Sequence, residues 1–272
     1  MAEVNFLAVH RKLREKRLAQ IVIQEMMRRK RKNGFAQAYY TSGHSMPTPF
    51  CTATFMNRFI NVEKLCQIKY TSKPRAEQSL ADYAKQHRLP KKETIQIKGE
   101  IRSMQKKDIA TVLKLFNKQQ SKYKIHYKMS QEDIVHHLMP KENVVWTYVI
   151  ENLDENGKKV VTDFFSMYRL TQTCTSKEYL GHKWDNMHSG SLFYYGLTEN
   201  TLEDVVKQCL YIARDEMECD AFSCMSIMDN KAELMVDRLG FLPGDGALHW
   251  YLVNWSLGNN KIESNDIGTI LI

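Results

Sequence analysis

Ten basic residues lie between Arg11 and Lys32, and Glu15 and Glu25 are the acidic residues of this stretch. Such a density of cations is typical either of a solvated helix face or of a surface that binds an anion. Proteins that bind nucleic acids interleave aromatic residues or glycines with such runs, and this stretch has neither. An anionic cofactor is therefore favoured over nucleic acid.

The elements around this run predict where the anion would bind. Val4–Val9 is a short, apolar, strand-like segment, and the polar turn Arg14–Arg17 follows it. Apolar residues at helical spacing begin at Leu18, Asn33-Gly34 ends that pattern, and Phe35–Tyr40 predicts a second strand. The helix in this βαβ unit would point its free N–H groups and positive dipole end at a phosphate.

Composition limits the remaining functions. The chain has 272 residues, a formal charge of +8 and 43% hydrophobic residues, enough for a sizeable core. The six cysteines form no CxxC pair and the nine histidines form no HExxH motif, so we expect reduced thiols and no metal site. Apolar runs are too short to cross a bilayer, and we expect a monomeric cytoplasmic protein without a transmembrane segment.

The rest of the chain alternates between helical and strand-like patterns. We expect loops or linkers at 42–49 and 71–100, and strands at 66–70, 144–151, 160–168, 221–228 and 248–255. We expect helices from Met104 to Phe116 and at 130–139, 202–217 and 231–239, the second capped by Ser130. Asn156-Gly157 predicts a hairpin turn. The order indicates an α/β (α+β) fold with mixed strand directions.

Several motifs resemble those of the eukaryotic N-myristoyltransferases, in the same order along nearly the whole chain. The match begins with EVNFLAVHRKLR at residues 3–14. It continues through Lys16-Arg17-Leu18-Ala19, Tyr40-Thr41-x-Gly43, Pro47-x-Pro49, Met129-Ser130-Gln131-Glu132, Thr162-Asp163-Phe164-x-Ser166, Phe193-Tyr194, Gly244-Asp245-Gly246 and Tyr251-Leu252-x-Asn254-Trp255. The resemblance implies a GNAT-like acyltransferase fold. Its later part, 101–272, would be a complete module on the peptide side, and 1–100 the later half of a module on the acyl-CoA side.

The resemblance implies an acyltransferase that moves myristate from myristoyl-CoA, a co-substrate, to the N-terminal glycine of proteins. No metal and no other cofactor would take part. In the family, the backbone N–H groups at Phe6 and Leu7 form an oxyanion hole, and Asn5 and Thr41 lie near the substrate amine. The terminal carboxylate, here at Ile272, would accept the proton of the amine. The apolar sequence of residues 268–272 is consistent with a buried tail.

The resemblance also assigns binding residues. Acyl-CoA would contact Phe6, Leu7, Arg14, Glu15, Lys16, Arg17, Leu18 and Ala19. The peptide would contact Thr41, Gly43, Phe55, Asn57, Ser166, Tyr194, Asp245 and Gly246. Four positions depart from the family pattern: Glu15 replaces a serine, Gln20 a proline, Phe55 a tyrosine and Asn57 a histidine. The first two would weaken CoA binding, and the last two would alter peptide preference.

In the family, a further region usually precedes the motif that matches residues 3–14. The match does not include that region. The alternative to an active acyltransferase is therefore a catalytically deficient or truncated relative that binds N-terminal peptides. A basic nucleic-acid-binding protein is a third reading that rests on the Arg11–Lys32 run alone.

The role of the Ile272 carboxylate as proton acceptor can be tested by changing its position or removing its charge. Appending one glycine would shift the charge by about 3.5 Å, and amidation would remove it. Either change should lower turnover about a hundredfold while acyl-CoA binding stays nearly constant, because only proton transfer is lost. Unchanged turnover in the glycine-extended protein, measured by release of CoA, would reject the assignment, and His10 would be the next base to test.

Overall fold

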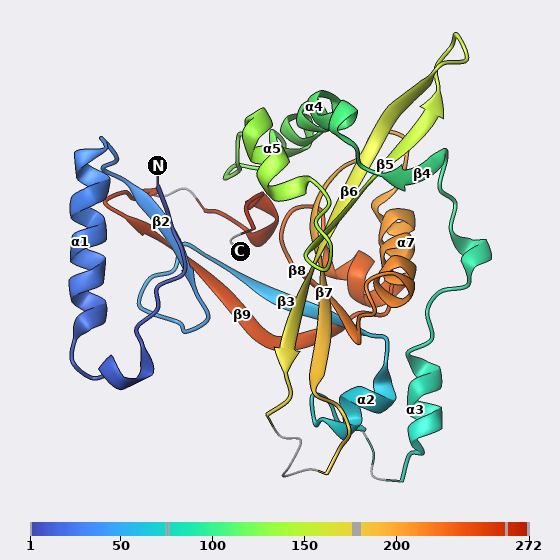
Figure 1. Cartoon of the computed structure of the whole chain (residues 1–272), viewed down its shortest axis with the longest axis horizontal. Coiled ribbons are helices and arrows are strands. Elements are labelled where there is room, and N and C mark those ends of the chain that lie inside the picture. The colour runs from blue at the N-terminus through green and yellow to red at the C-terminus, as the bar shows by residue number, and fades with distance from the viewer. Residues whose placement is uncertain (1, 74, 76, 176–180, 259–260, 271–272) are drawn as a thin grey trace.

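Nine strands form one open sheet within the part of the chain that the structure describes. The computed structural model describes residues 2–73, 75, 77–175, 181–258 and 261–270. The strands lie in the order β1-β2-β9-β3-β8-β7-β6-β5-β4 (Figure 1). Their bounds are β1 Ala2–Val4, β2 Ala38–Ser42, β3 Cys51–Phe59, β4 Glu100–Ser103, β5 Val145–Leu153, β6 Lys159–Thr173, β7 Asn186–Gly196, β8 Ala221–Met225 and β9 Leu242–Val253.

The sheet has mixed strand directions, as the order of elements predicts. The pairs β1–β2 and β7–β8 are parallel, and the other neighbours are antiparallel. The expected α/β fold is therefore confirmed. A division of the chain at residue 100 stays a prediction, and the strands of its two parts interleave: β3 lies between β8 and β9.

The helices border this sheet, and local capping accounts for where several of them begin. Their bounds are α1 Leu18–Lys32, α2 Val62–Gln67, α3 Leu80–Gln86, α4 Ile109–Gln120, α5 Gln131–Leu138 and α7 Leu202–Asp215. Glu233–Arg238 is a π-helical turn. Ser130 and Asp133 form a reciprocal capping box at α5, as expected from the sequence. Thr201 caps α7 by accepting the N–H of Asp204.

The main core lies between the middle strands and helices α4 and α7. Phe116 of α4 packs edge-on against Tyr194 of β7, with ring centroids 5.1 Å apart, and both side chains are fully buried. Val206 and Leu210 bring α7 into the same cluster. Burial of such side chains contributes about 1.5–3 kcal/mol each, so this half of the molecule forms the rigid support of the sheet.

The N-terminal elements form an arm at one end of the sheet. α1 stands beside β1 and β2 at the left of Figure 1, and only Lys30 of its fifteen residues is buried. By contrast, the C-terminal tail is buried as expected, up to the last described residue. Gly268 donates its N–H to Ile125, and Ile270 donates its N–H to the Tyr194 hydroxyl at 2.9 Å.

Three expected elements are wrong or incomplete. The strand expected at Val4–Val9 ends at Val4, because Phe6 takes a left-handed conformation with φ 54°. The strand expected at 66–70 is instead the end of α2 and a turn in which Lys69 has φ 56°. The expected linker 71–100 contains α3, whose Tyr83 is buried.

β3 has no counterpart among the expected elements. Its buried Cys51 and Ala53 alternate with the exposed Thr52 and Thr54, which is a period-two signal. The strand pairs with β9 and β8, both far away in the sequence. β3 therefore depends on pairing partners that a local pattern does not identify.

A buried histidine predicts how stability depends on pH. His87 follows α3 and accepts a hydrogen bond from the Arg58 guanidinium at 3.3 Å. Burial, and then the charge of Arg58, lower the pKa of His87. Below about pH 6.5 the unfolded chain binds a proton that the folded chain resists. Stability should therefore fall as the pH drops below that value.

The substitution His87→Gln keeps an acceptor for Arg58 but cannot titrate. Melting temperatures from pH 5 to 8 should show less acid destabilisation in this variant than in the parent protein. His44→Gln, in an exposed loop, is the control and should follow the parent curve. A parent-like pH curve for His87→Gln would contradict the prediction.

Candidate active site

An apolar cavity of about 960 Å³ lies between the end of β1, helix α1 and strand β2. Its volume is at the upper end of the range of about 300–1,000 Å³ that small-molecule sites occupy. Val22, Ile23 and Met26 of α1 supply an apolar wall. Four predicted catalytic residues line the cavity: Asn5, Phe6, Leu7 and Thr41.

A tight turn after β1 displays the backbone at the mouth of this cavity. The Phe6 and Leu7 side chains are 80% and 50% exposed, so core packing does not explain them. The Phe6 N–H donates to Asn5 Oδ1 at 3.0 Å. Thr41 lies on β2 opposite Trp250. The segment after β1 and strand β2 thus bring Phe6, Leu7 and Thr41 to one cavity.

A cluster of three hydroxyl and carboxyl groups fixes the base of this turn. Tyr127 donates to the Glu3 carboxylate, and the single O–H of Tyr39 lies within hydrogen-bond distance of both the Tyr127 hydroxyl, at 2.7 Å, and Glu3, at 3.3 Å. Glu3 also accepts a hydrogen bond of 3.4 Å from the side chain of Asn5. Partial burial raises the pKa of Glu3, although the hydrogen bonds with Tyr39 and Asn5 oppose the shift. Glu3 thus joins β1, β2 and the loop that contains Ile125.

The N-terminus of α1 opens onto a basic turn beside the cavity. Arg17 precedes α1 in a left-handed conformation, and no side chain caps the helix. The first turn contains no acidic residue, which leaves its N–H groups available to an anion. Arg14, Glu15, Lys16 and Ala19 of this segment are exposed, and Leu18 is partly buried. Glu15 has φ 66° and shares the turn with the cations.

Not all the cations of α1 are available to a ligand. Glu25 forms ion pairs with Arg28 at 2.6 Å and with Arg29 at 2.8 Å. These arginines lower the pKa of Glu25 to about 2. Arg31 and Lys32 at the end of α1 stay exposed, so positive charge lies at both ends of the helix, one of which is the turn where the phosphates were expected.

A second groove, of about 640 Å³, lies where β3, β6, β7 and β9 present polar side chains. Phe55, Asn57, Asp245 and Gly246 line it, so half of the predicted peptide-binding residues meet here. Its remaining lining includes Tyr168, Leu170 and Gln172 of β6, which sequence reasoning did not select. The three residues are spaced two apart on one strand, and this spacing could have indicated that their side chains share one face of the sheet.

Asp245 reaches this groove because β9 bulges. Thr54 pairs with Ala247 and Met56 with Pro243, so three residues of β9 stand opposite Phe55. A Cβ atom on Gly244 would lie 2.7 Å from the Asn57 amide nitrogen. A Cβ atom on Gly246 would lie 3.2 Å from the Phe55 ring. The glycines permit this close packing, and the bulge directs the residue between them.

The other predicted residues lie elsewhere. Ser166 is fully buried and shares a hydrogen bond of 2.8 Å with Thr147. Tyr194 is buried and holds Ile270 of the tail. Gly43 follows β2 in an exposed loop and lines neither cavity. Ile272 lies outside the described residues. Their proposed roles stay predictions.

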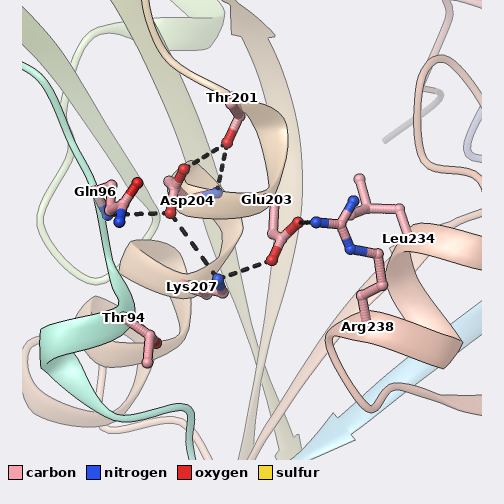
Figure 2. A pocket seen from close by; sticks show the side chains of 8 residues that line it. All are labelled: Thr94, Gln96, Thr201, Glu203, Asp204, Lys207, Leu234 and Arg238. Atoms are coloured by element: carbon pink, nitrogen blue, oxygen red, sulfur yellow. Dashed lines mark hydrogen bonds and ion pairs between the residues drawn. The ribbon is translucent and has the colours of Figure 1, made fainter.

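A third pocket, of about 440 Å³, contains none of the predicted residues. Figure 2 shows its charged side chains paired with one another. Lys207 contacts Glu203 at 2.8 Å, and Glu203 also binds Arg238. Asp204 accepts the backbone N–H of Gln96 at 3.1 Å. These contacts join α7 to neighbouring segments, so we assign the pocket a structural role.

Other classes of site receive no support from the described residues. They contain no cluster of three histidine, cysteine, aspartate or glutamate side chains that could hold a metal ion. No helix among them is both long and apolar enough to cross a membrane.

Comparison with known families matches both parts of the chain to one family. Residues 67–270 match the profile of the "Myristoyl-CoA:protein N-myristoyltransferase, C-terminal domain", and residues 1–53 match that of the N-terminal domain. The chain belongs to the N-myristoyltransferase family. The expected resemblance and its acyltransferase fold are thereby confirmed.

Individual N-myristoyltransferases show the same relationship. The chain is 35% identical over 272 residues to glycylpeptide N-tetradecanoyltransferase of Plasmodium falciparum, and it spans 62% of that protein. It is 35% identical to glycylpeptide N-tetradecanoyltransferase 2 of Bos taurus and spans 51% of it. A crystal structure of Saccharomyces cerevisiae N-myristoyltransferase with bound myristoyl-CoA superposes with a TM-score of 0.85 at 27% identity. That match covers 99% of this chain and 68% of the yeast chain.

The exposed Glu15 at the phosphate turn gives a test of the anion site. Glu15→Ser should tighten myristoyl-CoA binding, because it removes a negative charge beside the ligand's phosphates. Solvent screening limits the gain to about twofold to fivefold. Calorimetry would measure it, with Glu155→Ser, at an exposed hairpin turn, as the control. Equal or weaker binding by Glu15→Ser would reject this placement of the phosphates.

Proposed function

We propose that this N-myristoyltransferase transfers myristate from myristoyl-CoA to the N-terminal glycine of protein substrates, as a cytoplasmic monomer. The observation that supports this most is the apolar cavity that Asn5, Phe6, Leu7 and Thr41 line together. A hydrocarbon chain matches its apolar wall. The basic turn at the start of α1 suits the phosphates of CoA.

The proposed reaction needs no covalent acyl-enzyme. The glycine amine attacks the thioester carbonyl, a C–N bond forms, and the C–S bond breaks as CoA leaves. Negative charge develops on the carbonyl oxygen, where the backbone N–H groups at Phe6 and Leu7 would stabilise it. The amine has a reference pKa of about 8 and must lose a proton. Asn5 and Thr41 would hold it in position.

The acceptor of that proton would be the carboxylate of Ile272, as the family resemblance implies. The path of the tail supports this assignment up to Ile270, whose N–H and carbonyl both contact the Tyr194 hydroxyl. Within the buried tail, Gly268 allows a close approach to Tyr123 that a Cβ atom would prevent. Tyr194 would then act by positioning the tail rather than by contacting the peptide.

The groove beside Asp245 would bind the peptide that follows the glycine. Asp245 is the charged residue among those that line this groove, so a basic peptide residue fits there. Asn57 accepts a hydrogen bond from Ser223 at 2.7 Å, which leaves its amide N–H groups for the peptide. Phe55 offers an apolar face without a hydroxyl.

One observation favours the alternative, a relative that binds N-terminal peptides without turnover. The Phe6 N–H already donates to Asn5 Oδ1, so this hydrogen bond must open before that group can stabilise an oxyanion. Incubation with myristoyl-CoA and a glycine-initiated peptide separates the two functions. Mass spectrometry should find the peptide with myristate joined to its N-terminal amine by an amide bond. An alanine-initiated peptide should give no such product. Binding of the peptide without product would establish the alternative.

The oxyanion role belongs to the backbone, so two substitutions at Leu7 distinguish backbone from side chain. Leu7→Pro removes the N–H group and should lower turnover about a hundredfold. Leu7→Ala keeps the N–H group and should retain most of it. Turnover would be measured in single-turnover assays with bound myristoyl-CoA, so that weaker binding does not enter. Equal loss in both variants would contradict the backbone role.

A further inference from the structure

A pocket of about 700 Å³ adjoins the proposed peptide groove. Tyr70 and Thr71 line both hollows, so the two share a wall. The new part extends from this wall to Cys66 at the end of α2 and to Leu80 at the start of α3. None of the residues predicted from the sequence lines it.

The two hollows carry opposite charge. Lys69 and Lys73 are the charged residues that line the new pocket, whereas Asp245 is the charged residue of the adjoining groove. Lys69 is exposed and forms no ion pair among the described residues. Of the two adjoining hollows, one therefore carries an acidic side chain and the other two basic side chains.

Local hydrogen bonds fix the shape of the new pocket. Lys69 reverses the chain with φ 56°, and the Tyr70 N–H returns to the Leu65 carbonyl at 2.9 Å. The Tyr70 ring meets Phe59 edge-on at 6.3 Å. Gln67 is held by the Trp184 indole N–H at 2.8 Å. The Lys73 ammonium group donates to the Gln78 carbonyl at 2.7 Å. The fold thus places the Tyr70 ring and the backbone on either side of it.

We propose that this pocket binds a downstream segment of the polypeptide that is acylated, one with an apolar residue followed by acidic residues. The segment would leave the groove at Asp245, pass Tyr70 with its apolar side chain against that ring and Leu80, and pair its carboxylates with Lys69 and Lys73. This inference rests on the proposed function. It adds a preference that extends past the N-terminal residues of the substrate.

Two features favour a segment of the acylated polypeptide over a separate ligand. Acidic residues complement the lysines of the pocket, and the pocket adjoins the groove proposed for the N-terminal residues. A free peptide would lose translational freedom on binding, but a segment already tethered through its N-terminal residues is present at a high effective concentration. Each exposed ion pair contributes little by itself. Two lysines beside an apolar contact should therefore give a preference of about threefold to tenfold.

Three peptides test the proposal with the full chain. They share a glycine-initiated segment with one basic residue and end in Leu-Asp-Asp, Leu-Asn-Asn or Leu-Lys-Lys, placed stepwise further from the glycine. Fluorescence anisotropy should show the tightest binding for the acidic peptide at one or two spacings. The acyl-transfer assay should show the same order in kcat/KM. Binding is read without turnover, so the test does not depend on catalysis.

Exchange of one charge gives the strongest comparison. Lys69→Glu should reverse the order of the acidic and basic peptides. Lys158→Glu, an exposed position at the β5–β6 turn, is the matched control and should leave the order unchanged. The compared quantity is the ratio of the affinities for the acidic and basic peptides within one variant. A difference in folded fraction between variants therefore does not affect it.

Other outcomes separate this inference from the proposed function. If a short peptide is bound and acylated but the acidic extension gives no gain at any spacing, the pocket proposal is overturned and the function stands. If no glycine-initiated peptide binds, both are overturned. If oligothymidylate displaces the acidic peptide and binds more tightly, the pocket is an electrostatic site for nucleic acid, which also overturns the proposal.

Discussion

The pairing of β9 with both β2 and β3 is the constraint on which both halves of the candidate site depend. β9 comes from residues 242–253, yet it lies between two strands that end before residue 60. Thr41 keeps its place because β2 pairs with β9, and the peptide groove keeps its wall because β3 does. A single strand thus sets the relative position of the apolar cavity and the groove beside Asp245.

A smaller junction fixes the acyl cavity to the remainder of the protein. Glu3 and Tyr39 are paired across β1 and β2, and Tyr127 reaches them from the loop that also bonds the tail. The two phenols offset part of the cost of removing the Glu3 carboxylate in part from water. The turn that carries Phe6 and the buried tail are thereby attached to the same cluster, although they lie at opposite ends of the chain.

Elements with strong local signals were predicted well from the sequence. Helix α5 follows from its Ser130 capping box, and the end of α1 follows from Asn33-Gly34. Signals that depend on distant partners were weaker. β3 is defined by pairing with β8 and β9, and residues 66–70 became a helix end because Leu65 packs into a small core with Phe59.

The same distinction applies to the site. Motif resemblance selected Asn5, Phe6, Leu7 and Thr41, and the fold brings them to one cavity. It did not reveal that Tyr194 holds the tail or that β6 lines the peptide groove, because these contacts arise from tertiary packing. Lys69 carried no motif at all. Its proposed role follows from the turn that the structure has where the sequence predicts a strand.

The sparse packing of α1 has a consequence for how the acyl cavity opens. A helix with one buried residue can detach or unfold at a cost far below that of global unfolding, so its amides should exchange with solvent early. The adjoining sheet would remain intact, since its core lies at the other end. A bound acyl chain would supply the apolar contacts that the helix lacks. Binding of such a chain and local folding of this wall would then be coupled, so that a ligand in the cavity would stabilise the helix.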